Sequence, residues 1–114
     1  PILDDGSMIT GQVGTDLTVE QGAQAARQVG LNIIASLQAE IGDLERVERV
    51  SKLFGMVNAG PSFNQHPLVI NGCSQLFCDL WGNDHGVGVR SACGVSGLPG
   101  NVAVEIEGAF LLKE

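Results

Sequence analysis

The chain has 114 residues, 44% of them hydrophobic, which suits one folded domain with a single core. Its formal net charge is −7, and it has four Phe, one Trp and no Tyr, so it lacks the dense basic surface and the stacking aromatics that nucleic acids require. We therefore disfavour a nucleic acid as the main partner. No apolar run approaches the length of a membrane span and no signal segment opens the chain, so we expect no membrane contact and a cytoplasmic location.

The first predicted element is a long helix over Val19–Ile41. Thr18 and Gln21 form the pattern of a capping box, in which each residue satisfies a free N–H of the other. Apolar residues then recur at helical spacing through this range, and Gly42 provides a C-terminal stop. Residues 1–14 carry turn signals but no complete element, so we expect the chain to begin partway into its fold, as one domain without a first hairpin.

A strand and a second helix are predicted in the middle of the chain. Residues 46–57 mix apolar and charged side chains in a way that fits a strand, apolar on both faces toward its end. A helical pattern follows Pro67, which is tolerated in a first turn because its missing N–H would be unpaired there anyway. Gly82 closes this helix.

Two strands are predicted at the end of the chain, over residues 87–96 and 101–112. Leu98-Pro99-Gly100-Asn101 lies between them and places Pro and Gly at the centre of a type II turn. We therefore predict that these two strands pair directly as a hairpin.

The order of these elements is helix, strand, helix, strand, strand, which predicts an α+β fold. The second helix would be a crossover between parallel strands, so both helices should cover one face of a mixed sheet. The opposite face would be partly apolar and uncovered within one chain. Such a surface usually meets another subunit.

The cysteines and histidines give no sign of a disulfide or of a metal site. Cys73, Cys78 and Cys93 are odd in number and irregular in spacing, and the first two fit an apolar helical stripe as small packed side chains. His66 and His85 lie in or beside loops without a second ligand at metal spacing. We expect no metal and no other cofactor.

Arg90 and Glu105 are the strongest candidates for chemistry. On neighbouring strands they would be offset along the ladder, yet they could flank one pocket, particularly one that a second subunit closes. Arg90 could capture a carboxylate with its planar fork of donors, and Glu105 could place a water or move a proton. The alternative is a cross-strand charge pair on a solvated face, worth under about 1 kcal/mol. Spacing alone leaves both interpretations open.

The segments around these two residues resemble the YjgF/Rid family. The likeness extends over essentially the whole chain, including Gly11 to Thr18 and Pro67 to Gly72. Its most specific parts are the blocks Arg90-Ser91-Ala92, Leu98-Pro99 and Val104-Glu105-Ile106-Glu107.

The resemblance implies a chorismate-mutase-like fold and a homotrimer with pockets between its subunits. It also implies an enzyme that hydrolyses reactive enamines and imines, such as 2-aminoacrylate, to 2-keto acids and ammonia without a cofactor. Arg90 would then be catalytic and hold the substrate carboxylate, with the backbone N–H of Ala92 and with Val89 beside it. Glu105 would be the second catalytic residue and position the attacking water.

Two features differ from the pattern of the well-known deaminases in this family. Their N-terminal hairpin has no counterpart in residues 1–14, and many of them carry Cys where this chain has Ala92. Cys93 follows one residue later, and strand alternation directs it to the other face.

Two other functions remain open at this stage. One is a regulatory trimer that binds a small carboxylate without turnover. The other is an endoribonuclease or translation inhibitor, an activity reported under names used for this family, which the acidic charge and the sparse aromatics disfavour.

Overall fold

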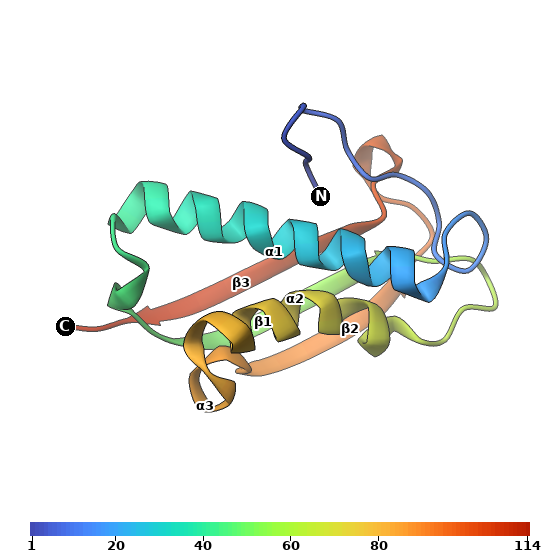
Figure 1. Cartoon of the computed structure of the whole chain (residues 1–114). Coiled ribbons are helices and arrows are strands. Elements are labelled where there is room, and N and C mark those ends of the chain that lie inside the picture. The colour runs from blue at the N-terminus through green and yellow to red at the C-terminus, as the bar shows by residue number, and fades with distance from the viewer.

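A three-stranded mixed sheet forms the base of the molecule, and the computed structural model describes all residues 1–114. The central strand β1 (Val47–Asn58) runs parallel to β2 (Val89–Val95) and antiparallel to β3 (Val104–Leu112) (Figure 1). Both β2 and β3 are therefore edge strands.

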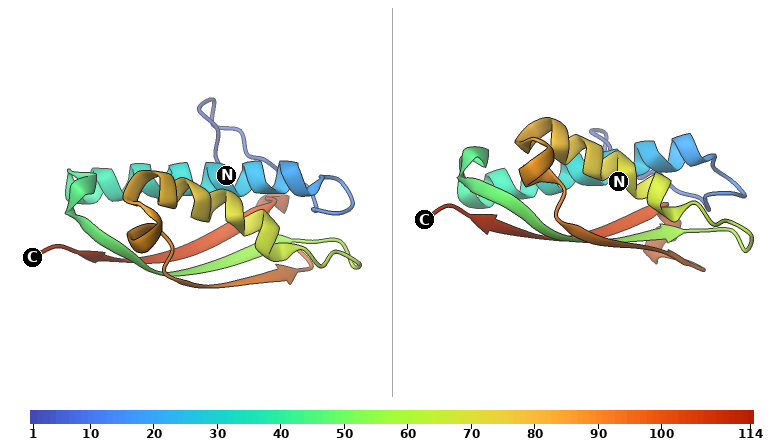
Figure 2. Two further views of the ribbon diagram at one scale, coloured as in Figure 1. Left: turned by 60° about the horizontal axis from the view of Figure 1, so that its bottom comes forward. Right: turned by 90° about the horizontal axis from the view of Figure 1, so that it is seen from below.

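Two long helices cover one face of this sheet, as the sequence predicts. α1 (Val19–Ile41) crosses over β3, and α2 (His66–Trp81) crosses over β1 and β2 (Figure 2). A short helix α3 (Asn83–Gly86) and two 3₁₀ turns, Leu44–Arg46 and Pro99–Asn101, complete the chain. Neither long helix combines the length and the apolar character that crossing a membrane requires.

The ends of α1 are fixed by local contacts that the sequence predicted. The backbone N–H of Gln21 donates to Thr18 Oγ1 at 3.1 Å, and the N–H of Thr18 donates to Gln21 Oε1 at 2.8 Å. Gly42 ends the helix with a φ of 86°, which a residue with a side chain rarely adopts. The capping box and the stop are both confirmed.

The predicted hairpin between the last two strands is wrong. The turn itself forms, since the N–H of Asn101 donates to Leu98 O at 3.0 Å and Gly100 has a φ of 64°. However, the end of β1 is inserted between the two strands. The N–H of Asn58 donates to Ala103 O and the N–H of Ala59 donates to Val95 O, so the 96–103 connection crosses over β1.

The core lies between the sheet and the helices. Two irregularities of pairing in β1, at Val47/Arg49 and Val50/Lys52, keep its apolar residues on the helix side despite their uneven spacing. A fully buried Leu or Phe contributes roughly 1.5–3 kcal/mol relative to an exposed one. The largest fully buried apolar side chains are Phe77, Leu53, Ile70, Val13, Val50, Val57, Val69 and Val104.

Small residues let the two helices approach closely. A side chain added at Gly72 of α2 would overlap the backbone carbonyl of Ala23 in α1. A backbone carbonyl cannot rotate away as a flexible side chain can, so this contact fixes the distance between the helices.

We predict that Gly72→Ala destabilises the fold by about 1–3 kcal/mol, because the overlap with α1 outweighs the better helix propensity of Ala. The free energy of unfolding in urea measures this. Gly97→Ala is the matched control, since nothing lies within 4 Å of its added methyl group. Equal stability of the Gly72 variant and the wild type would show that α1 can move away from α2 at little cost.

Candidate functional site

Arg90 lies on β2, and two side chains of α2 bind its guanidinium group. Its Nη1 donates to Ser74 Oγ at 3.0 Å and its Nη2 donates to Asn71 Oδ1 at 2.7 Å. Asn71 and Ser74 are three residues apart on the helix, so both project toward β2. A guanidinium group has five N–H donors, and these two bonds leave three for a ligand. Arg90 is therefore a half-buried, oriented cation with unpaired donors, an arrangement suited to an anion.

Sequence reasoning did not single out Asn71 and Ser74 as partners of Arg90. A signal was present, since both are polar residues at helical spacing in a helix whose other face is apolar. That pattern does not show which strand packs against this side of the helix.

Ala92 and Val89 lie on opposite faces of β2. Ala92 is two residues after Arg90, shares its face and packs against the core. The Val89 side chain faces the other way and is 69% exposed. Only Ala92 therefore extends the helix-side surface around Arg90, and because β2 is an edge strand, every second N–H on it points away from β1.

Glu105 is placed far from Arg90 in the sheet. Glu105 lies opposite Met56 on β1, while Arg90 lies opposite Leu53, so the two are offset by three positions and separated by a strand. The neighbours of Glu105 on β3, Val104 and Ile106, pack toward the helices, which directs Glu105 to the helix-free face.

The two predicted catalytic residues thus do not share a pocket within one chain. The expectation that they flank one pocket depended on the hairpin, and the insertion of β1 separates them. Each lies instead at its own edge of the sheet. Glu105 lines a hollow of about 220 Å³ at the edge of β3, together with Met56 and Glu107.

Arg90 acts electrostatically on the thiol of Cys73, but this thiol is not a nucleophile. Burial raises the pKa of the Cys73 thiol to about 12, and the positive charge of Arg90 acts in the opposite direction without cancelling this. Cys93 lies opposite Met56 and so faces away from Ala92, as strand alternation predicts. Neither sulfur stands in for a Cys at position 92.

The two histidines lie apart. His85 Nδ1 is 2.9 Å from Glu48 O, which ties α3 to β1. His66 opens α2 and lies beside β2. No group of three or more His, Cys, Asp or Glu side chains gathers where a metal ion could bind.

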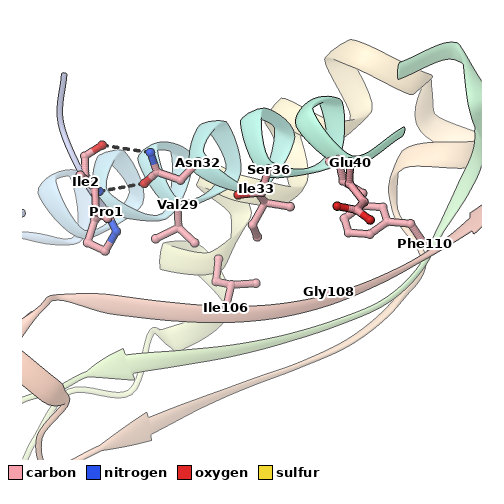
Figure 3. A pocket seen from close by; sticks show the side chains of 11 residues that line it. Pro1, Ile2, Val29, Asn32, Ile33, Ser36, Glu40, Ile106, Gly108 and Phe110 are labelled. Carbon is pink, nitrogen blue, oxygen red and sulfur yellow. Dashed lines mark hydrogen bonds between the residues drawn. The ribbon is translucent and has the colours of Figure 1, made fainter. Parts of the chain in front are cut away.

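The largest cavity, about 570 Å³, is a groove between α1 and β3 on the side away from Arg90 (Figure 3). Its walls are mainly apolar and include Val29, Ile106 and Phe110. At one end Asn32 holds the backbone of Ile2, accepting from its N–H at 2.8 Å and donating to its carbonyl at 3.0 Å. This groove contains none of the predicted site residues.

Comparison with known proteins identifies the family. The model of a family described as "YjgF/chorismate mutase-like, putative endoribonuclease" matches residues 1–102. The chain belongs to this YjgF family. Protein TCP17 of Trypanosoma cruzi is 44% identical over 107 residues, which cover 94% of this chain and 67% of TCP17.

Solved YjgF-like structures share the fold closely. The crystal structure of Atu1372 from Agrobacterium tumefaciens, a protein of unknown function, superposes with a TM-score of 0.93 at 37% identity, covering 98% of this chain and 72% of that one. A "putative endoribonuclease" from Shewanella oneidensis gives a TM-score of 0.87 at 31% identity, covering 93% and 70%. The chorismate-mutase-like α+β fold expected from the sequence is confirmed.

We predict that Cys73 does not react with a thiol reagent such as iodoacetamide in the folded protein, even at pH 10. A thiol whose pKa is raised to about 12 stays neutral there, and the side chain is buried. Mass spectrometry after labelling, with and without urea, measures this. The half-buried Cys78 on the same helix is the internal control, and labelling of Cys73 as fast as Cys78 would contradict its placement in the core.

Proposed function

We propose that this protein hydrolyses small 2-imino and 2-enamino acids to 2-oxo acids and ammonia, at sites shared between the subunits of a cytoplasmic homotrimer. The observation that carries the proposal is Arg90, oriented by Asn71 and Ser74 at an open sheet edge with three N–H donors free. Membership of the YjgF family supports it.

This geometry supports capture of the substrate carboxylate by Arg90. A guanidinium matches a carboxylate with two parallel N–H donors, which fixes the anion in position and orientation. Asn71 and Ser74 hold the guanidinium before the ligand arrives, so little side-chain entropy is lost on binding. A free backbone N–H on the edge strand near Ala92 adds a further donor.

The reaction itself needs few groups. An enamine first takes a proton on its β-carbon and becomes the iminium. Water then adds to the electrophilic carbon, and Glu105 accepts the proton that the water loses. The resulting carbinolamine takes a proton on nitrogen from Glu105; its hydroxyl then returns a proton to Glu105 as ammonia leaves and the C=O bond of the 2-oxo acid forms.

The separation of Arg90 and Glu105 supports a site built from two copies. Arg90 belongs to the β2 edge and Glu105 to the β3 edge, at opposite sides of one sheet. An interface that joins one edge region of a subunit to the opposite edge region of the next is heterologous, and it generates a closed ring when the rotation closes. The exposed helix-free face, with Phe54, Met56 and Cys93, supplies apolar surface for such a ring.

Charge favours a small anion over RNA as the ligand. The net charge is −7, and Arg90 is engaged by α2 rather than part of a basic surface. Binding of a 2-oxo acid without turnover would indicate the regulatory alternative, and RNA cleavage that is lost in Arg90→Ala would indicate the ribonuclease alternative.

We predict that Arg90→Ala lowers kcat/KM for 2-aminoacrylate by about 100- to 1000-fold, because two charge-assisted hydrogen bonds are lost. Glu105→Gln should lower kcat by about 100-fold or more, because Gln cannot accept the proton. Release of the 2-oxo acid in a coupled assay measures both. Glu20→Gln, an exposed carboxylate in the first turn of α1, is the control and should retain activity within about twofold. Full turnover in both site variants would disprove these roles.

We further predict that mixing Arg90→Ala and Glu105→Gln subunits restores activity. Each variant still supplies the residue that the other lacks, and in a randomly mixed ring about one interface in four pairs both intact residues. The expected recovery after joint refolding is therefore about a quarter of the wild-type activity. No recovery in oligomers that are shown to be mixed would place both residues in the same subunit's site.

A further inference from the structure

His66, the first residue of α2, lies over the same face of β2 as Arg90, near the end of that strand. Arg90, Ala92 and Gly94 alternate onto the helix side of this strand, opposite Leu53, Gly55 and Val57 respectively. Gly94 has no side chain, and a Cβ added there would overlap Nε2 of His66. The imidazole therefore fills the place on this row that a side chain at position 94 would take.

The polar atoms of this imidazole have no partner within the chain. The Phe63 ring packs against His66 edge-to-face, with centroids 5.2 Å apart, and so helps to orient it. Neither ring nitrogen of His66 makes a hydrogen bond, in contrast to His85, whose Nδ1 is paired with Glu48 O. A half-buried, oriented imidazole with free nitrogens is suited to contact a ligand.

The distance between His66 and Arg90 determines the length of a ligand that contacts both side chains. Gly94 is four residues from Arg90, about 13 Å along an extended strand. Asn71, which holds the guanidinium, is five residues from His66, about 7.5 Å along the helix axis. The gap between guanidinium and imidazole is thus about 8 to 13 Å. This suits a carbon chain of five or six atoms that carries a polar group at each end.

We propose that His66 binds the distal carboxylate or amide of the substrate and so makes the site selective for five- or six-carbon 2-imino acids that carry a second polar group. This inference rests on the carboxylate site at Arg90 proposed above. Imidazole offers at least one N–H donor in either protonation state. Ala92 lies between Arg90 and Gly94 on this row and supplies an apolar surface for the intervening methylene groups.

The test is binding of the product-like 2-oxo acids, which needs no turnover. Calorimetry with 2-oxoglutarate and 2-oxobutyrate should show tighter binding of the dicarboxylate by the wild type. His66→Phe should weaken 2-oxoglutarate by about 10- to 100-fold, the effect of losing a hydrogen bond to a charged group, and 2-oxobutyrate by less than about twofold. His66→Gln, which keeps an N–H donor, should recover part of the selectivity.

A second variant separates ligand contact from folding. Gly94→Ala leaves the imidazole intact but displaces it, and should reduce the preference for 2-oxoglutarate in the same way. His85→Gln is the control and should change neither affinity. Equal loss for both oxo acids in His66→Phe would indicate a structural role and overturn the inference, as would a wild type that does not prefer the dicarboxylate or binds neither acid.

The same set of variants distinguishes this inference from the proposed function. Turnover of short imines without His66-dependent selectivity would refute the inference alone. Selective binding that depends on His66 and Arg90, without any turnover, would refute the hydrolytic function and leave the inference standing.

Discussion

The position of β1 between its two neighbours is the constraint on which the rest of the structure depends. Because β1 is hydrogen-bonded on both sides, β2 and β3 become the two edges of the sheet, and the residues on them are kept apart. Arg90 and Glu105, fifteen residues apart in sequence, consequently lie on different edges and different faces. A site that uses both residues must therefore draw on more than one copy of the chain.

The Arg90 site shows how a charge is kept close to the core without a carboxylate partner. Placing a guanidinium between a strand and a helix removes part of its hydration, a cost that only hydrogen bonding can offset. Asn71 and Ser74 supply neutral acceptors for this purpose. A carboxylate in their place would neutralise the guanidinium and compete with an anionic ligand. Neutral acceptors orient Arg90 and leave its charge available.

The features that the sequence predicted are those that local interactions determine. The capping box and Gly42 define α1 within a few residues, and alternation correctly directed Cys93 away from the face of Ala92. The partner of β3 is a long-range choice. A turn with Pro99 and Gly100 is compatible with a hairpin and equally with a connection that crosses β1, and only the packed sheet distinguishes them. The hydrogen bonds from Arg90 to Asn71 and Ser74 were not predicted for the same reason, since they join α2 to β2, and this contact depends on the completed crossover.

The same long-range arrangement gives meaning to residues that look unremarkable in sequence. Gly72 is needed because a side chain there would overlap Ala23 of the other helix. Gly94 leaves room for the imidazole of His66, which a side chain at position 94 would overlap. Both glycines act through the absence of a side chain, and neither is required for a turn. The crossover that separates Arg90 from Glu105 also brings the start of α2 over the end of β2. It thereby sets an imidazole in line with the guanidinium, so one topological feature separates Arg90 from Glu105 within a chain and lengthens the surface available to the proposed ligand.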